Sequence, residues 1–406
     1  MRVLLTTYDS RGGVEPLLGL AVQLQAIGAE ALLCVPPDEE FAQRAAAFGV
    51  PLVPFGDPVQ AMSTGAAQAT ESDVRRHVLG LIDAQFDTVA AAAQGCDALL
   101  SAGLIWTSAG ARSVCDKLGI HYVYASYHPT HLPSPHHPPP EFAGRGLSPS
   151  QAENRYMWDR NARDANALFG PTLNGHRASL DMPLVGDLRS YAYTERPWLA
   201  SDPTLGPWPQ PAEFDVVQTG AWLVDDARPL PDDLADFLDA GSPPVYVGFG
   251  SMPLWGTNDL GRTAVEAIRA QGWRTLLARG WADLDLIDDA DDCFVVGEVN
   301  QQALFPRVAA AIHHGGAGTT TTAARAGVPQ LVVPQGADQV YWARRVIELG
   351  IGTACDGPAP PLRALSQALE AIVTPATQAC ARDVARSMRT DGAAVAAKML
   401  LDVAGG

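Results

Sequence analysis

Residues 312–320 read Ile-His-His-Gly-Gly-Ala-Gly-Thr-Thr, and this stretch decides the fold. The apolar run 308–312 in front of it predicts a buried parallel strand, and residues 319–326 predict the start of a helix. Glycines at such a turn let the backbone approach a ligand closely, and a helix N-terminus offers free N–H groups and a positive dipole to a phosphate. A lone glycine-rich loop is more often an ordinary tight turn, so a phosphate site needs support from the residues that follow.

Short apolar runs alternate with helical patterns in both halves of the chain, which is typical of α/β proteins with doubly wound parallel sheets. In the first half, Leu17, Leu20, Leu24 and Ile27 give one apolar helical face, with Gly28 as its stop. The other expected helices are 41–47, 107–117 and 379–403, the last with a break at Gly392. The expected strands are 3–7, 31–35, 97–100, 122–125, 245–249, 274–278, 293–296, 308–312, 331–333 and 352–355.

Composition narrows the function. The net charge of −17 argues against nucleic acid or an anionic membrane as a partner, because both need a basic surface. Six cysteines without a CxxC pair fit reduced thiols rather than a disulfide or zinc scaffold. The N-terminal apolar run breaks too early for a signal peptide, and no transmembrane helix is expected. We therefore expect a soluble cytoplasmic protein.

Two proline-rich stretches interrupt the α/β rhythm. Residues 129–147 predict a functional loop rather than a linker, and residues 197–211 show no regular element and suggest the connection between domains. The expected organisation is a first domain over 1–205, a linker over 206–215 and a second domain over 216–385. A C-terminal helix over 386–406 is expected to pack back on the first domain.

Three loops follow expected strands and are rich in small residues: 9–13, 248–251 and 313–320. Ligands of open parallel sheets bind beyond the carboxyl ends of the strands. If the two halves face each other, all three loops open into one cleft, which would hold an anionic ligand between two domains.

The motifs that follow the loop at residues 313–320 give a family resemblance. The stretch 313–320 continues through Ala-Arg-Ala-Gly-Val-Pro-Gln (324–330), Val-Pro-Gln (333–335) and Ala-Asp-Gln (337–339). Together these resemble the donor-binding signature of family 1 nucleotide-sugar glycosyltransferases, whose GT-B fold has two Rossmann-like domains facing across a cleft. Residues 1–5, 10–12, 219–222, 244–251 and 279–283 extend the resemblance to the bacterial enzymes that glycosylate vancomycin- and teicoplanin-type aglycones.

The resemblance implies a donor site in the second domain. His314 would donate to the donor diphosphate, and a helix N-terminus would cradle it. Trp281 and residues 298–301 would form the nucleobase slot, and Asp338 and Gln339 would bond sugar hydroxyls. Asp338 could equally be an N-cap of the helix that follows, and both roles could coexist. The implied donor-binding residues are Ser10, Arg11, Gly12, Ser251, Trp281, Val299, His314, Gly316, Ala317, Gly318, Thr319, Asp338 and Gln339.

The region around residues 121–137 holds five of the nine histidines. Intervening prolines and the absence of nearby cysteines disfavour a metal site. We interpret residues 127–142 as a solvent-facing, aromatic-lined acceptor loop in which any one histidine is a surface residue rather than a catalyst. The candidate acceptor-binding residues are His128, His131 and Pro135.

The resemblance implies an inverting hexosyltransferase that needs neither metal nor cofactor. Its donor would be a UDP- or dTDP-linked hexose, glucose or N-acetylglucosamine, and its acceptor a hydroxyl of a crosslinked heptapeptide aglycone in antibiotic biosynthesis. A monomer is expected. Two alternatives stay open: a sugar-nucleotide epimerase of similar build, and a catalytically weak or silent nucleotide-sugar-binding protein.

The alternative of a weak or silent nucleotide-sugar-binding protein arises because this sequence departs from the family pattern at one position. Relatives carry an aspartate at the position of Gly13, where a glycine cannot accept a proton. The nearest carboxylate on the turn is Asp9, which could be the general base. Asp9 could equally cap the turn through nearby backbone N–H groups. Two further possibilities are that Ser10 relays the proton, or that His128 or another loop histidine is the base.

Overall fold

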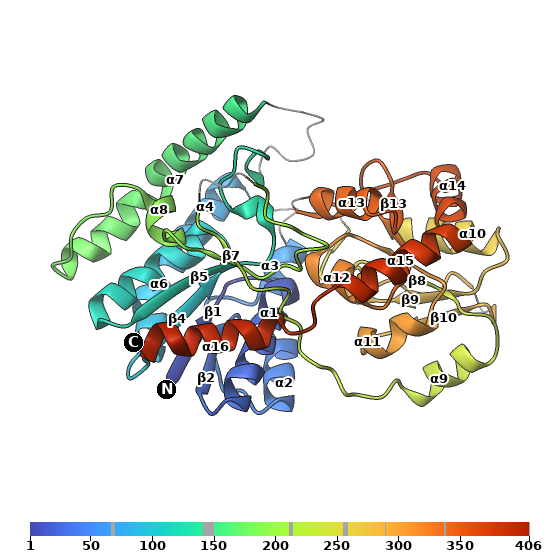
Figure 1. The fold of residues 1–406 in the computed structure, drawn as a ribbon, viewed down its shortest axis with the longest axis horizontal. Helices are drawn as coiled ribbons and strands as arrows, with labels where there is room; N and C mark the ends of the chain where they lie inside the picture. Colours follow the sequence, from blue (N-terminus) through green and yellow to red (C-terminus); the bar gives the residue numbers. More distant parts are fainter. Residues whose placement is uncertain are drawn as a thin grey trace. The chain divides into compact units, whose positions relative to one another are not determined.

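The computed structural model describes residues 1–65, 70–140, 150–210, 214–254, 259–288, 290–336 and 338–405. The chain forms two compact units (Figure 1). Unit 1 comprises Met1–Pro203, Pro207–Val224 and Arg389–Gly406, and unit 2 comprises Thr204–Gly206 and Asp225–Met388. The chain passes from unit 1 to unit 2 after Val224, which is later than the expected linker at 206–215.

Unit 1 is built on a seven-stranded parallel sheet with the order β3-β2-β1-β4-β5-β6-β7. Because every paired strand runs parallel, the carboxyl ends of the strands share one edge. The strands are β1 (Arg2–Thr6), β2 (Glu30–Val35), β3 (Leu52–Pro54), β4 (Ala98–Ala102), β5 (His121–Ser126), β6 (Trp198–Leu199) and β7 (Val217–Gln218).

Helices cover both faces of this sheet, as the strand sequences require. Val3 and Leu5 belong to one buried cluster with α1, whereas Leu4 between them belongs to another cluster with α4 and α6. Alternate residues are thus buried on both sides, the usual state of parallel strands. The helices are α1 (Arg11–Ala26), α2 (Glu39–Ala47), α3 (Val59–Gly65), α4 (Glu71–Ala84), α5 (Ala90–Ala92), α6 (Ile105–Leu118), α7 (Gln151–Ser179), α8 (Leu188–Tyr193) and α16 (Gly392–Gly405).

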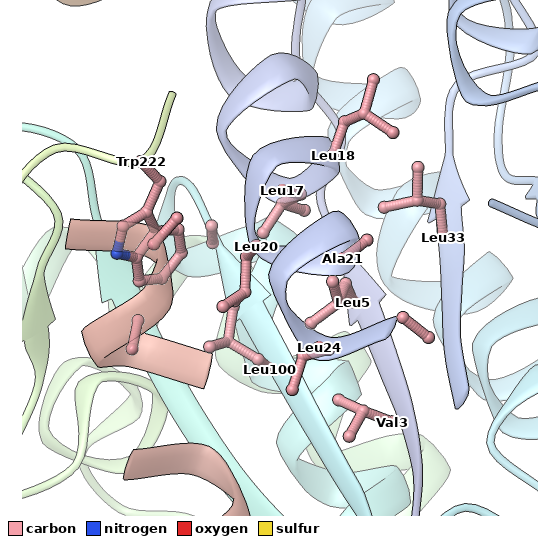
Figure 2. Close-up of a cluster of buried hydrophobic side chains, with 14 of the residues drawn as sticks. Val3, Leu5, Leu17, Leu18, Leu20, Ala21, Leu24, Leu33, Leu100 and Trp222 are labelled. Atoms are coloured by element: carbon pink, nitrogen blue, oxygen red, sulfur yellow. The ribbon is translucent and has the colours of Figure 1, made fainter. Parts of the chain in front are cut away.

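Helix α1 directly follows β1 and fixes the first turn of unit 1. Leu17, Leu20 and Leu24 are fully buried at helical spacing, and Figure 2 shows them among side chains of the neighbouring strands. The helix ends before Gly28, whose φ of 84° suits glycine. Leu17, Leu20 and Leu24 therefore anchor α1, and with it the turn that carries Asp9. Ile27, also expected on this face, follows the helix and is 39% exposed.

The C-terminal helix α16 belongs to unit 1 and lies beside α1. Ala393, Ala396 and Leu400 join the same buried cluster as Trp222. The backbones of Gly220 and Gly392 approach so closely that a Cβ at residue 392 would lie 2.5 Å from the Ala221 carbonyl oxygen. The expected helix over 379–403 is two helices, and the chain returns to unit 1 at Arg389, between them.

Unit 2 contains a six-stranded parallel sheet with the order β10-β9-β8-β11-β12-β13. Its strands are β8 (Val245–Gly248), β9 (Thr275–Ala278), β10 (Cys293–Val296), β11 (Ala310–His313), β12 (Gln330–Val332) and β13 (Gly352–Ala354). Its helices are α9 (Asp232–Asp239), α10 (Leu260–Arg269), α11 (Gln301–Leu304), α12 (Ala317–Arg325), α13 (Gln339–Glu348), α14 (Leu362–Ile372) and α15 (Pro375–Ser387). Val245 and Val247 face one buried cluster, and Tyr246 faces another.

Two sequence expectations about the proline-rich stretches are wrong. Within 197–211, residues Trp198 and Leu199 form strand β6, which pairs with β5; both side chains are buried, so packing overrides the neighbouring prolines. The loop after β5 is not solvent-facing, since Leu132 is fully buried and Ser134 nearly so. Residues 141–149, where this loop was expected to end, lie outside the described residues.

Within the described residues, no helix is both long and apolar enough to span a membrane.

Candidate functional site

The turn after β11 places His314 against two glycine backbones. A Cβ on Gly250, in the turn after the neighbouring strand β8, would lie 3.2 Å from His314 Cε1. A Cβ on Gly316 would lie 2.4 Å from His314 Nε2, which is closer than atoms tolerate. Glycine at 316 therefore makes room for the imidazole, and the φ of 57° at Gly250 suits glycine as well.

His314 is a neutral hydrogen-bonding group. Burial, with a smaller contribution from His313, lowers the pKa of His314 to about 3. Its Nδ1 is enclosed and has no hydrogen-bond partner among the residues that the structure describes. A neutral imidazole offers one N–H donor and one acceptor. The side chain can therefore donate to an anion without carrying charge.

The preceding histidine is a structural residue. His313 is fully buried; its Nδ1 accepts from the Gly315 N–H at 3.0 Å, and its Nε2 lies 2.9 Å from Gln330 Oε1. An accepting Nδ1 puts the proton on Nε2, which donates to Gln330. Burial lowers the pKa of His313 to about 4. His313 thus ties the glycine turn to strand β12.

Helix α12 begins with unused backbone donors. Gly316 is the N-cap, and the first helical bond runs from the Thr320 N–H to the Gly316 carbonyl at 3.0 Å. The N–H groups of Ala317, Gly318 and Thr319 precede that bond, and the first turn contains no acidic residue. These N–H groups and the helix dipole suit an anion.

The turns after β8 and β9 are joined by backbone contacts. The Trp281 N–H donates to the Gly250 carbonyl at 2.9 Å, and a Cβ on Gly280 would lie 2.5 Å from that same oxygen. The φ of Gly280 is 54°. Ser251 follows Gly250 on this braced turn and is half-buried. Strand adjacency therefore brings Ser251, Trp281 and His314 to one region of unit 2.

Asp338 and Gln339 lie where β12 leads into α13. Asp338 is the N-cap residue of α13, but its side chain makes no capping hydrogen bond; its Oδ2 accepts from the Trp342 indole at 3.0 Å. Gln339 is buried, and its Oε1 accepts from the Gln335 N–H at 2.7 Å. Asp338 is thus the N-cap residue that the sequence suggested, without a side-chain capping bond. Gln339 braces the loop, and the contacts of both residues with a sugar stay predictions.

The segment expected to hold the nucleobase is rigidly built. Asn300 caps α11 through the N–H groups of Gln302 and Ala303, and its amide donates to two carbonyls near Arg228. Glu298 pairs with Arg228 at 2.6 Å. Val299 between them is buried in the core of unit 2, so its backbone rather than its side chain is the part suited to ligand contact.

In unit 1, the turn after β1 holds Asp9 over Gly13. A Cβ at position 13 would lie 2.5 Å from the Asp9 Cβ and 2.6 Å from its Oδ2. The carboxylate thus occupies the space into which a side chain at residue 13 would grow. Its Oδ1 also accepts from the Ser10 N–H at 2.6 Å, so Asp9 does contact turn backbone.

The surroundings of Asp9 include a residue that the sequence did not single out. Tyr127, at the end of β5, donates its hydroxyl to the Gly13 carbonyl at 2.8 Å. Burial, and then the charge of Asp9, raise the pKa of Tyr127 well above its usual value, so it stays a donor. Ser10 is the N-cap of α1 without a side-chain capping bond, Gly12 follows in the first turn, and Arg11 lies 3.4 Å from Glu15.

The proposed acceptor residues are more enclosed than expected. His128 is buried, its Nδ1 lies 2.9 Å from Thr130 Oγ1, and burial lowers its pKa to about 3. Its ring centroid lies 3.7 Å from that of His131. Pro135 is buried, and its carbonyl accepts from Asn154 at 2.8 Å. A surface role for His128 is therefore wrong, because hydroxyls and neighbouring rings surround it.

Across the part of the chain that the structure describes, no three His, Cys, Asp or Glu side chains are grouped so as to hold a metal ion.

Comparison with known proteins decides the family. The chain is 52% identical over 402 residues to the vancomycin aglycone glucosyltransferase of Amycolatopsis orientalis, covering 99% of this chain and 97% of that protein. It is 50% identical over 406 residues to glycosyltransferase GtfE of the same organism, covering 100% and 98%. The chain belongs to the glycopeptide-antibiotic glycosyltransferases of family 1.

Other comparisons agree with the assignment of this chain to the glycopeptide glycosyltransferases. Residues 282–398 match the model of the erythromycin biosynthesis protein CIII-like C-terminal domain. The dTDP-epi-vancosaminyltransferase of Amycolatopsis orientalis is 48% identical, with 95% of this chain and 93% of that protein covered. The crystal structure of glycosyltransferase VinC in complex with dTDP has a TM-score of 0.71 at 20% identity, covering both chains fully. The two Rossmann-like parallel-sheet domains thus form a GT-B fold.

Proposed function

We propose that this glycosyltransferase moves glucose or N-acetylglucosamine from a UDP- or dTDP-sugar to a hydroxyl of a glycopeptide aglycone, with inversion and without a metal. The observation that carries the proposal is the turn after β11. A neutral imidazole beside three unused N–H groups is a donor set for a diphosphate. The most similar relatives described above, one of them named as an aglycone glucosyltransferase, support the sugar and the acceptor.

The reaction is a single in-line displacement. The acceptor hydroxyl gives its proton to the base and forms a bond to the anomeric carbon, while the bond from that carbon to the diphosphate oxygen breaks. The configuration inverts because attack and departure are on opposite faces. Negative charge grows on the leaving diphosphate, and His314 with the N-terminus of α12 stabilises it; this takes the place of a divalent cation.

The base in this proposal is Asp9. Its carboxylate lies over Gly13, in the volume where the aspartate of relatives would begin. Ser10, one residue further, is too weak a base by itself, and His128 is enclosed with its imidazole bonded to Thr130. Since a general base contributes about 10²- to 10⁴-fold, loss of Asp9 function should be plain in turnover.

The direct test supplies UDP-glucose, dTDP-glucose, UDP-N-acetylglucosamine or a deoxysugar donor together with the aglycone of vancomycin. Product is followed by mass spectrometry, and its anomeric configuration by NMR. Transfer of a hydroxylated hexose with inversion is expected, because a site built around Asp338 leaves polar groups unpaired when a hydroxyl is missing. A preference for the deoxysugar donor would overturn the sugar assignment.

The same assay separates the second candidate, a silent nucleotide-sugar-binding protein, which the glycine at residue 13 favours. That protein would bind UDP or dTDP in calorimetry and form no product with any acceptor. An epimerase would convert the donor without acceptor; the transferase names of the relatives disfavour it.

A further inference from the structure

A small pocket of about 120 Å³ opens in unit 1 beside the segment that follows β5. Its walls come from four places in the sequence: that segment, the first turns of α7, the start of α8, and Phe214 ahead of β7. The lining residues include Ser134, Arg155, Trp158, Asp159, Arg189 and Phe214. None of them belongs to the donor or base positions described above.

The pocket has the charge of an anion site. Among the residues that the structure describes, two arginines, Arg155 and Arg189, and one carboxylate, Asp159, line it. This lining contrasts with the chain as a whole, which carries a net charge of −17. A local positive site in an acidic protein selects a ligand by short-range contacts, because the long-range field repels anions.

Arg189 has a donor that the protein leaves unused. Its Nη1 donates to the Trp158 carbonyl at 2.5 Å, and its guanidinium carbon lies 6.0 Å from the Trp158 ring centroid. Its Nε is enclosed and has no acceptor among the residues that the structure describes. An enclosed N–H without a partner is unfavourable, and a ligand oxygen would satisfy it.

The walls are fixed and partly aromatic. The Trp158 indole donates to the His137 carbonyl at 2.9 Å, and the Trp158 side chain is buried. Burial lowers the pKa of His137 to about 4, so this neighbour adds no positive charge at neutral pH. Phe214 supplies a second ring. The space thus suits a planar anionic group carried on an apolar or aromatic body.

We propose that this pocket binds a carboxylate of the peptide acceptor, with Arg155 and Arg189 as its donors. Guanidinium groups match carboxylates in geometry and bond both oxygens at once. The pocket lies beyond the carboxyl end of β5, and β5 is two strands from β1, which carries Asp9. The two strands are about 10 Å apart across the sheet, and in this proposal a large acceptor spans from the pocket to Asp9. This assignment rests on the proposed acceptor class.

The test compares vancomycin aglycone as the free acid with its C-terminal amide, in the wild type and in Arg155→Gln and Arg189→Lys. The wild type should prefer the acid by roughly tenfold or more in kcat/KM. Arg155→Gln should bring the acid-to-amide ratio close to one. Arg189→Lys keeps the positive charge but loses the two-pronged guanidinium that can bond both carboxylate oxygens. It should therefore give an intermediate acid-to-amide ratio. Arg160→Gln, in the exposed pair with Asp164 on the same helix, should keep the wild-type ratio.

The outcomes separate the two proposals. Equal kcat/KM values for acid and amide in the wild type overturn the carboxylate site and leave the proposed transfer intact. An acid preference that Arg155→Gln and Arg160→Gln leave equally unchanged also overturns it. Absence of transfer to either acceptor contradicts the proposed function. In that case calorimetry measures the affinities of the wild type and of Arg155→Gln for the acid and for the amide, and the acid-to-amide ratio of affinities tests the pocket.

Discussion

The turn after β11 in unit 2 and the turn after β1 in unit 1 share a backbone plan but differ in chemistry. Both follow a buried parallel strand and lead into a helix with glycines in its first turns. At α12 the chain provides a neutral histidine and no acidic residue. At α1 it provides a carboxylate whose oxygen already accepts from the Ser10 N–H.

The difference shows what decides the role of a strand-to-helix turn. A helix N-terminus favours negative charge, whether that charge comes from a ligand or from the chain itself. At α12 the first turn holds no acidic residue, and we propose that a phosphate takes this position. At α1 Asp9 takes it, and the glycine at residue 13 makes room for the carboxylate. In each turn, therefore, a glycine makes room for the side chain to which we assign a role.

A large effect that sharpens this comparison is expected from His314→Ala. Removing the imidazole takes one donor from the leaving diphosphate, which should cost about 3 kcal/mol in the transition state, or roughly 10²-fold in kcat. Turnover on a confirmed donor and acceptor measures it. His121→Ala, at an exposed histidine, is the control. Equal turnover of the His314 variant and wild type would remove this residue from the mechanism.

A smaller effect is expected from Gly316→Ala. The new methyl would lie 2.4 Å from His314 Nε2, so the imidazole must move from its place beside α12. We expect a loss of about tenfold in kcat/KM, since a misplaced donor keeps part of its effect. Gly318→Ala is the matched comparison, because nothing lies within 4 Å of its added methyl. If the two variants lose activity equally, the close fit of His314 to Gly316 is irrelevant.

A separate effect concerns acid stability. Burial lowers the pKa of His313 in unit 2 to about 4 and that of His128 in unit 1 to about 3, against about 6.5 in the unfolded chain. The unfolded chain therefore binds more protons below pH 6.5, and the free energy of unfolding falls as pH drops toward 4. Each histidine contributes at most about 1.4 kcal/mol per pH unit. Urea unfolding at pH 7 and pH 5 measures the slope; unchanged stability would contradict the buried neutral state.

The sequence predicted ten strands and helix α1 because their patterns are local, whereas β3, β7 and the long helix α7 were not expected. Leu17, Leu20 and Leu24 repeat at helical spacing, and each of the ten expected strands is present within a few residues. Strand β6 was not predicted because a strand of two residues is too short to show an alternating pattern. Its place in the sheet is evident only from the structure, where Trp198 is buried.

The candidate site was less accessible to sequence reasoning. The motif at 313–320 indicated a phosphate loop, but nothing local distinguishes His313, which braces β12, from His314. The neutral state of His314 depends on burial by distant residues. The place of Asp9 over Gly13, and the Tyr127 bond to the Gly13 carbonyl, depend on the helical turn and on a strand more than a hundred residues away.

We propose that Asp9 is the general base, in place of the aspartate that the family resemblance assigns to residue 13. The most direct measurement is the turnover of Asp9→Asn and of the exchange Asp9→Gly/Gly13→Asp on a confirmed acceptor. Glycine is chosen at residue 9 because even the Asp9 Cβ lies 2.5 Å from a Cβ at residue 13. Asp9→Asn should lose about 10²- to 10⁴-fold in kcat, and the exchange should recover part of that loss. Wild-type turnover by Asp9→Asn would contradict the claim.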